Sequence, residues 1–338
     1  MSDLHLCRVV RFHQLGGPEV LRLEHEEPPA PQPDEVQLQV EAIALNRADA
    51  MFRRGTYLEK PTFPARSGFE ASGVITAVGV DIADFRIGDR VNVIPGASVA
   101  RHGTAADWLT LPARHVIHRP FGLNALQAAA FWMSFVTAYG ALVEHCRLSA
   151  GQWVLITAAS SSVGLTAIQI ARAVGARPIA TILDDGLRAA MFDAGAEAVI
   201  VSDQEDLGAR LLQITGGVAA GGGLHAAFDA VGGPQVAAIA EAMRPSGTIV
   251  IHGALSPQPT PFPLKVALRH SLALRGYVYT DVTGNPDVLT RAARFAHEAI
   301  AAGHLMPRID RVFPLDRIVD AHRHLESGTA FGKIVLRP

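Results

Sequence analysis

One stretch decides the fold of the chain: WVLITAASSSVGLTAIQIAR, from Trp153 to Arg172. An apolar run passes through a turn of small residues directly into a segment with helical periodicity. A buried strand that leads into a helix in this way brings unpaired N–H groups and the positive end of the helix dipole to one point. Small side chains there let the backbone approach a phosphate. The stretch therefore predicts a dinucleotide-binding turn, with contacts from Ser160, Ser161, Ser162 and Val163.

Of the three glycines that are typical of such turns, this chain has only the last. If the register is set by the last glycine, Ala158 and Ser161 occupy the first two positions and Gly164 the third. For the turn alone, a tight strand-to-helix connection that binds nothing remains an alternative. The next elements favour binding, because a helix over 165–174 and a strand over 177–183 complete a βαβ unit.

Three further apolar runs predict more strands, at 198–201, 226–231 and 247–251. Glycine follows the carboxyl end of the runs at several of these places. Ligands of open α/β sheets bind outside the carboxyl ends of the strands, where backbone must come close to them. The series therefore predicts a single cofactor crevice.

Composition predicts an ordinary globular protein of two domains, with 338 residues, 49% of them hydrophobic and 18% charged. A net charge of −2 without a basic stripe argues against nucleic acid or an anionic membrane surface as the main partner. Residues 1–20 do not show the continuous apolar core and small-residue cleavage site typical of an export signal, and no apolar run reaches about 18 residues, so we expect a cytoplasmic protein. Only two cysteines occur, Cys7 and Cys146, far apart and without paired spacing, which excludes a CxxC redox pair and a four-cysteine zinc lobe.

The flanking regions differ from the middle of the chain. Alternating patterns at 36–42 and 73–79, separated by turns rich in proline and glycine, predict a mainly β domain at the start. A helix over 286–302 and a strand over 333–336 follow the middle region. We expect this tail to return to the first domain, which gives one domain from residues 1–125 and 275–338 around an inserted domain, 126–274.

Seven motifs occur in order: 10–13 with 16–21, 44–49, 68–73, 88–91, the serine-rich turn, 228–233 and 332–336. Together they resemble the medium-chain dehydrogenase/reductase superfamily, specifically its zinc-free quinone oxidoreductase branch. The resemblance covers nearly the whole chain. It implies an α/β protein with a GroES-like, mainly β catalytic domain, a Rossmann dinucleotide-binding domain with a doubly wound parallel sheet, and a homodimer.

Departures from the superfamily's alcohol dehydrogenases bear on the chemistry. Those enzymes hold zinc with a cysteine where this chain has Asn46 and with a histidine where it has Phe69. Neither a neutral amide nor a phenyl ring replaces thiolate or imidazole as a zinc ligand. We therefore expect no zinc.

Two residues are the expected catalytic groups. Tyr57 matches a tyrosine that lines the substrate cleft in the quinone oxidoreductase branch, and Asn46 matches a position beside the nicotinamide. A hydroxyl can donate to a developing oxyanion, and an amide can orient a ribose or polarise an oxygen. The alternatives are a turn tyrosine that packs on prolines and an asparagine that caps the next helix.

Other cofactor contacts also follow from the resemblance. Thr137 matches a threonine that faces the nicotinamide, although a helix-interior threonine that bonds its own backbone is the alternative. Glu70 reads as a structural carboxylate paired with a cation rather than as a general acid. The remaining contacts implied are Val231, Gly232, Gly253, Ala254, Leu255 and Lys333.

The choice between NADH and NADPH stays open. Asp184, after the second strand, would repel a 2′-phosphate and could accept hydrogen bonds from a free ribose. Arg188, at the start of the next helix, could bind that phosphate.

The expected function is zinc-independent hydride transfer from NADH or NADPH to quinones or α,β-unsaturated carbonyls. Two alternatives remain: an alcohol or aldehyde dehydrogenase of the same superfamily, and an NAD(P)H-binding protein with little turnover.

Overall fold

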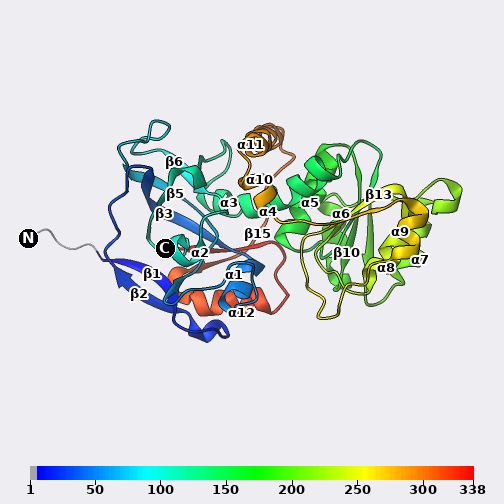
Figure 1. The fold of residues 1–338 in the computed structure, drawn as a ribbon, viewed down its shortest axis with the longest axis horizontal. Helices are drawn as coiled ribbons and strands as arrows, with labels where there is room; N and C mark the ends of the chain where they lie inside the picture. Colours follow the sequence, from blue (N-terminus) through cyan, green and yellow to red (C-terminus); the bar gives the residue numbers. More distant parts are fainter. Residues whose placement is uncertain (1–5) are drawn as a thin grey trace, which may run out of the picture. The chain divides into compact units, whose positions relative to one another are not determined.

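The computed structural model describes residues 6–338, which divide into two compact units (Figure 1). Unit 1 contains residues 6–133 and Pro307–Pro338, and unit 2 contains Ser134–Met306. Both boundaries come later than the sequence patterns predict, 133/134 instead of 125/126 and 306/307 instead of 274/275. The second difference has a physical cause, because residues after 274 pack within unit 2. The Tyr277 hydroxyl donates to the Val136 carbonyl at 2.7 Å, and Arg291 forms an ion pair with Glu144.

Unit 2 is built on a six-stranded sheet whose strands all run parallel. The order β11-β10-β9-β12-β13-β14 corresponds to 3-2-1-4-5-6, the order of doubly wound dinucleotide-binding folds. This confirms the predicted parallel sheet and adds a sixth strand. The strands are β9 (Trp153–Ile156), β10 (Arg177–Ile182), β11 (Ala198–Val201), β12 (Leu224–Asp229), β13 (Met243–Ile251) and β14 (Ala273–Gly276).

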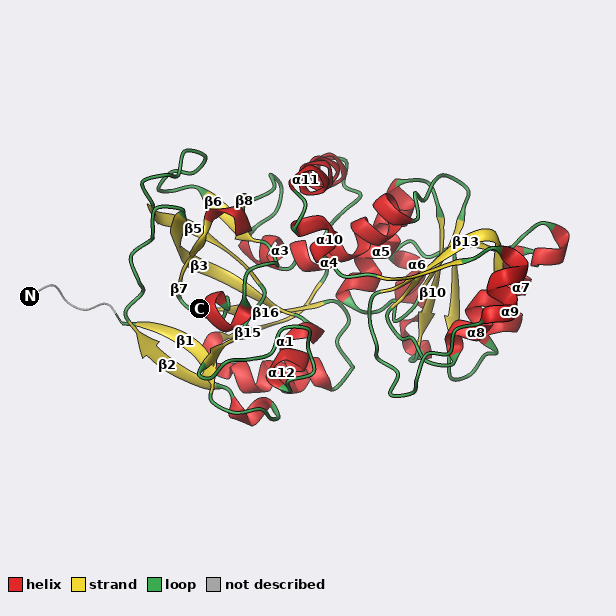
Figure 2. Cartoon of the chain, viewed as in Figure 1, coloured by secondary structure: helices red, strands yellow, loops and turns green. Residues whose placement is uncertain are grey.

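Helices cover both faces of this sheet (Figure 2). Apolar side chains in the middle of successive strands, such as Leu155, Ile179, Ala227 and Ile249, are fully buried, which is what a parallel sheet covered on both faces requires. The helices of this region are α4 (Trp132–Tyr139), α5 (Ser162–Ala173), α6 (Arg188–Asp193), α7 (Leu207–Thr215), α8 (Gln235–Glu241), α9 (Leu264–His270), α10 (Thr280–Thr283) and α11 (Pro286–Ala301).

Unit 1 is mainly β, as predicted. One sheet has the order β15-β16-β3-β5-β6-β8, with β7 also paired to β3, and a second has the order β2-β1-β4. The last strand, β16, pairs antiparallel with β3, so the carboxyl-terminal tail joins the amino-terminal domain as expected. The strands are β1 (Cys7–Phe12), β2 (Arg22–Glu26), β3 (Glu35–Leu45), β4 (Ala65–Arg66), β5 (Glu70–Val78), β6 (Arg90–Val93), β7 (Trp108–Pro112), β8 (Val116–His118), β15 (Ile309–Pro314) and β16 (Lys333–Arg337).

The helices of unit 1 are short: α1 (Arg47–Arg53), α2 (Val99–His102), α3 (Ala125–Ala129) and α12 (Ile318–Glu326). A buried polar cluster joins α1 to α12. The Arg53 guanidinium lies 2.6 Å from Nδ1 of His322 and pairs with Glu326. Because arginine can only donate, Nδ1 of His322 must accept, and the ring is neutral. Burial, followed by the charge of Arg53, lowers the pKa of His322 to about 3.

This cluster predicts a loss of stability in acid. In the unfolded chain His322 takes up a proton near pH 6.5, whereas in the folded chain it does so only near pH 3. The contribution of His322 to the free energy of unfolding is therefore fully present above its unfolded pKa and decreases as the pH falls below that value. From pH 7 to pH 5.5 it should decrease by about 1 kcal/mol.

Denaturant unfolding at the two pH values checks this in wild type, in His322→Gln and in a control, His25→Gln, at an exposed site. The His322 variant should lose about 1 kcal/mol less than wild type on acidification, and the control should follow wild type. An equal pH dependence in all three proteins would contradict the assignment.

Candidate active site

The turn between β9 and α5 has the geometry of an anion-binding turn. Ser161 is the N-cap of α5, and its hydroxyl accepts from the Gly164 N–H at 3.0 Å. A Cβ at Gly164 would lie 2.6 Å from the Cα of Ala159, so only glycine allows this approach of helix and turn. Ala158 adopts a positive φ of 48°. The register predicted from Gly164 therefore agrees with the observed backbone.

The amino-terminal end of α5 is suited to a phosphate. Ser160, Ser161, Ser162 and Val163 are only half-buried, so this end of the helix is accessible. The first N–H groups of a helix have no partner within it, and the aligned peptide dipoles place partial positive charge there. This supports the predicted pyrophosphate contact, which these residues would make largely through backbone.

A buried carboxylate, Asp229, organises the neighbouring strand ends. It accepts hydrogen bonds from the Thr157 hydroxyl at 2.7 Å and from the N–H groups of Val231 and Gly232 at 3.0 and 2.9 Å. The Gln235 amide donates a fourth, at 2.9 Å. Asp229 ends β12 and Thr157 follows β9, the two strands between which the strand order reverses. Ligands bind at such a reversal.

Sequence reasoning did not select Asp229 as a site residue. The signal was present, because a carboxylate that directly follows the apolar residues 226–228 must be hydrogen-bonded where it is buried. Its partners could not be read from the sequence.

The loops after β12 and β13 lie against each other. A Cβ at Gly253 would lie 2.5 Å from the Ala230 carbonyl oxygen, and the Leu255 N–H donates to the same oxygen at 3.2 Å. The two loops thus meet at the carboxyl ends of β12 and β13. They contain Val231 and Gly232 in the first loop, and Gly253, Ala254 and Leu255 in the second. Ala254 and Leu255 are exposed there, as a ligand contact requires.

His252 precedes Gly253 and carries no charge at neutral pH. Its ring stacks on Phe228, with ring centroids 3.9 Å apart. Burial lowers the pKa of His252 to about 3, because the charged imidazolium would lose its hydration. The residue that follows β13 is therefore uncharged.

The end of β10 is acidic. Asp184 is exposed, and its carboxylate accepts from the Gly186 N–H at 2.9 Å. Arg188 is held by other carboxylates: it donates to Asp185 at 2.6 Å and to Glu205 at 3.1 Å. The guanidinium that could have bound a 2′-phosphate is thus already paired.

In unit 1, the Asn46 side chain is fixed by a buried ion pair. Its Oδ1 accepts from the Lys333 ammonium at 2.5 Å, and its Nδ2 donates to Glu70 at 3.1 Å. Lys333 and Glu70 themselves lie 2.8 Å apart, each with a side chain only 1% exposed. Because an ammonium only donates and a carboxylate only accepts, the orientation of the amide is determined. Asn46 also occupies the N-cap position of α1, as the alternative interpretation expected.

These contacts confirm that Glu70 is a buried carboxylate paired with a cation. Its second oxygen accepts from the Met133 N–H at 2.8 Å. The cofactor contact expected of Lys333 stays a prediction, and the structure adds a contact with Asn46. The predicted contact of Thr137, buried in α4, also stays a prediction.

A second buried acid, Asp49, supports Asn46 from the backbone side. Its carboxylate accepts from the N–H groups of Asn46 and Gly68, at 2.8 and 3.0 Å. Burial raises the pKa of Asp49 to about 7, against the opposing effect of those hydrogen bonds and of Lys333. Sequence reasoning did not single out Asp49.

Tyr57 packs edge-on against Phe69, with ring centroids 5.1 Å apart. Phe69 is buried and Tyr57 is partly exposed, so the tyrosine is the accessible member of the pair. The phenyl ring of Phe69 stands at one of the two positions where the superfamily's zinc enzymes have a ligand, and at the other, Oδ1 of Asn46 accepts from the Lys333 ammonium. Among residues 6–338, no three histidine, cysteine, aspartate or glutamate side chains are grouped as a metal site would need.

Across the same described residues, no helix is both long enough and apolar enough to cross a membrane.

Two family models match the chain: an alcohol dehydrogenase GroES-like domain over residues 32–158 and a zinc-binding dehydrogenase over 194–336. Quinone oxidoreductase 1 of Escherichia coli is 30% identical, over 97% of this chain and 99% of its own length. A crystal structure of Escherichia coli quinone oxidoreductase complexed with NADPH matches with a TM-score of 0.88 and 29% identity, over 98% of this chain and 100% of that one. A crystal structure described as an NAD-dependent alcohol dehydrogenase matches with a TM-score of 0.87 and 30% identity, over 98% and 99%.

The hydrogen bonds of Asp229 predict that Asp229→Asn weakens cofactor binding. The amide nitrogen would face N–H donors that it cannot accept from, so unit 2 should lose about 1 to 3 kcal/mol of stability. Affinity for reduced nicotinamide dinucleotide should fall about 10-fold. Titration by cofactor fluorescence measures this, with Asp203→Asn, at an exposed position, as the control. Unchanged affinity in Asp229→Asn would remove the residue from the site.

Proposed function

Because this chain belongs to the medium-chain dehydrogenase/reductase superfamily, in its quinone oxidoreductase branch, we propose that it reduces quinones or α,β-unsaturated carbonyls with NADH and without zinc. That the protein is an NAD(P)H-dependent oxidoreductase follows from its family. The acceptor, the preference for NADH and the independence of zinc are the proposal. We also propose a cytoplasmic homodimer, which the resemblance and the composition favour.

The observation that carries the proposal is the set of contacts around Asn46. Where the superfamily's alcohol dehydrogenases need a thiolate, this chain has an amide held between Lys333 and Glu70. An alcohol must lose its proton before it can give up hydride, and a metal promotes this step. An enone or a quinone already carries an electron-poor carbon, so its reduction needs alignment and a hydrogen-bond donor rather than a strong Lewis acid.

Hydride is the chemistry that a bound reduced nicotinamide supplies. The residues of the turn before α5 and of the loops after β12 and β13 fit its pyrophosphate and its nicotinamide end. Tyr57 would donate a hydrogen bond to the oxygen on which negative charge develops. Asn46 has one Nδ2 hydrogen directed at the Ala44 carbonyl over a long 3.4 Å, and this weakly bonded hydrogen is the one available to a ligand.

Charge at the end of β10 favours NADH. A 2′-phosphate carries about −2 charge and would meet Asp184 and Asp185, while Arg188 is occupied by Asp185 and Glu205. The Asp184 carboxylate can instead accept hydrogen bonds from the free ribose hydroxyls of NADH.

Deuterium transfer tests the proposed reaction. With NADH deuterated at C4 and a small enone, the label should appear at the β-carbon of the product, and 1,4-benzoquinone should oxidise NADH at a comparable or faster rate. Oxidation of simple alcohols by NAD+ at a higher kcat/KM would favour the alcohol dehydrogenase instead. Stoichiometric cofactor binding without turnover on any acceptor would favour a binding protein.

Tyr57→Phe tests the donor. Loss of the hydroxyl should lower kcat/KM for an enone about 10- to 100-fold, because the hydrogen bond strengthens as charge develops on the oxygen. Cofactor affinity should stay nearly unchanged. Steady-state kinetics at saturating NADH measure the effect, and an unchanged kcat/KM would remove Tyr57 from the mechanism.

Asp184→Arg tests the ribose contact. The substitution should shift the ratio of kcat/KM for NADH and NADPH towards NADPH by about 1 to 2 kcal/mol. Asp193→Arg makes the same charge change at another exposed position and should leave the ratio near wild type. Equal shifts in both variants would show a general charge effect and place Asp184 away from the ribose.

A further inference from the structure

His252 directly follows β13, at the carboxyl ends of the parallel strands of unit 2. A doubly wound sheet has two halves, and each half binds one nucleotide of a dinucleotide. The half formed by β9, β10 and β11 contains the turn suited to the pyrophosphate and, after β10, the carboxylate of Asp184 that suits the adenosine ribose. This leaves the ends of β12 and β13 for the nicotinamide nucleotide.

The ring of His252 is held in one orientation. Its backbone N–H donates to the Asp229 carbonyl at 2.9 Å, which fixes the chain at this point. Val250, two residues earlier, pairs with Phe228 on the neighbouring strand, so Phe228 and His252 project from the same face of the sheet. The two rings stack there, with centroids 3.9 Å apart and planes inclined by 15°. Because Phe228 is fully buried, it provides a rigid support for the imidazole.

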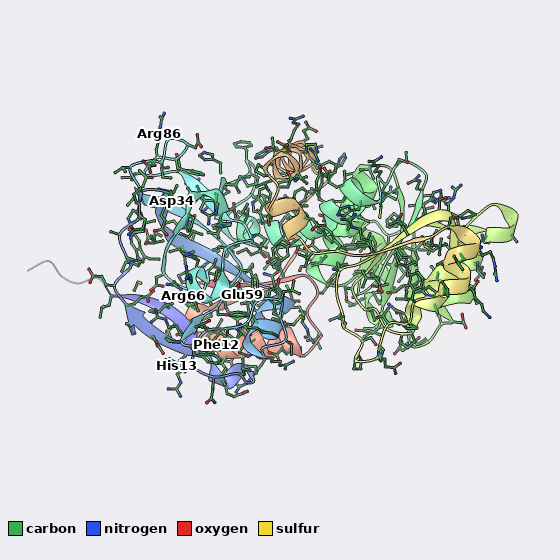
Figure 3. The ribbon with its side chains drawn as sticks, in the orientation of Figure 1. Phe12, His13, Asp34, Glu59, Arg66 and Arg86 are labelled. Carbon is green, nitrogen blue, oxygen red and sulfur yellow. The ribbon has the colours of Figure 1, made fainter. Side chains whose placement is uncertain are left out.

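One nitrogen of this ring, Nε2, is buried and has no hydrogen-bond partner among the described residues. Polar atoms that are shielded from water normally have such a partner, because an unpaired one loses its hydration without compensation. His13, labelled in Figure 3, shows the usual arrangement, with its Nε2 2.6 Å from the Glu24 carboxylate. The neutral ring of His252 can instead donate to or accept from an uncharged group.

The position of His252 matters more than the missing partner alone. A second buried ring nitrogen of unit 2, Nδ1 of His270, also has no partner among the residues that the structure describes. His270 ends α9, and β14 begins three residues later at Ala273. Because the strands are parallel, the start of β14 lies at their amino ends, opposite to the ends where ligands bind. Only His252 combines an unpartnered nitrogen with a place at the carboxyl ends.

We propose that Nε2 of His252 forms a hydrogen bond with the nicotinamide nucleotide of the bound cofactor, which rests on the cofactor binding of the proposed function. The carboxamide and the ribose hydroxyls of that nucleotide are uncharged, and each can both donate and accept. The stack on Phe228 orients the imidazole before binding, so little side-chain freedom is lost when the bond forms. His252 contributes to binding in this way and transfers neither proton nor hydride.

Calorimetric titration with ADP, ADP-ribose and NADH tests this without any turnover. ADP lacks the second nucleotide, ADP-ribose adds its ribose, and NADH adds the nicotinamide. His252→Phe keeps a ring for the stack and removes both nitrogens, so the Kd for NADH should rise about 5- to 10-fold. The Kd for ADP should stay within about twofold of wild type. His252→Gln provides an amide that can replace Nε2 and should bring the Kd for NADH back to within about threefold of wild type.

ADP-ribose identifies the group that His252 contacts. A Kd for ADP-ribose that rises in His252→Phe as much as the Kd for NADH supports a bond to the ribose. A Kd for ADP-ribose that does not change, together with a raised Kd for NADH, supports a bond to the carboxamide.

His270→Phe is the matched control, because it makes the same substitution at the unpartnered histidine near the amino ends of the strands. Its three dissociation constants should stay within about twofold of wild type. Circular dichroism and thermal melting confirm that each variant is folded. If His252→Phe does not fold, wild-type protein labelled with 15N-histidine replaces it. The Nε2 resonance of His252, assigned by its absence from His252→Gln, should then move when NADH is added and stay in place when ADP is added.

The outcomes separate this inference from the proposed function. A wild-type protein that binds none of the three ligands overturns the proposed function and the inference with it. A wild-type protein that binds NADH, together with an unchanged Kd in His252→Phe, overturns the inference alone. Equal losses of affinity for ADP and NADH in His252→Phe also overturn it, because they would show a general disturbance of unit 2. A Nε2 resonance that does not respond to NADH has the same consequence.

Discussion

The candidate catalytic site of unit 1 depends on one buried ion pair. An ammonium cannot be buried without a counter-charge, and Lys333, with 1% of its side chain exposed, has Glu70 at 2.8 Å. Once that pair is in place, the amide of Asn46 can lie in one orientation only. The same pair joins β16 to β5, so residues from the end of the chain complete a site that begins at residue 46. Removal of either charge would leave the other buried and unpaired.

In unit 2, the buried carboxylate of Asp229 orients its polar neighbours as the Lys333–Glu70 pair does in unit 1. Asp229 gathers donors from the turn after β9 and from the loop after β12, at the reversal of the strand order. Its hydrogen bonds hold the backbone around the positive end of α5, where the predicted pyrophosphate contact lies. In each unit, burial raises the energy of an unpaired charge, and pairing therefore selects one arrangement of the surrounding polar groups.

Much of this could be predicted from the sequence, because it rests on local pattern. The apolar runs at 153–156 and 198–201, the turn before Gly164 and the return of the tail to the first domain all appear in the structure. Contacts between distant residues could not be predicted from the residues themselves. Asn46 and Lys333 are 287 positions apart, and the pairing of Arg188 with Glu205 depends on how a loop folds back. The late boundary at 306/307 likewise follows from the ion pair of Arg291 with Glu144.

We propose that a site containing Asn46, Phe69 and Lys333 reduces quinones and enones without zinc. Turnover of 1,4-benzoquinone by protein whose zinc content is known, before and after treatment with chelator, measures this directly. The rate per protein molecule should be the same in both samples and should not follow the zinc content. A rate that disappears with the metal and returns when zinc is added would contradict the claim.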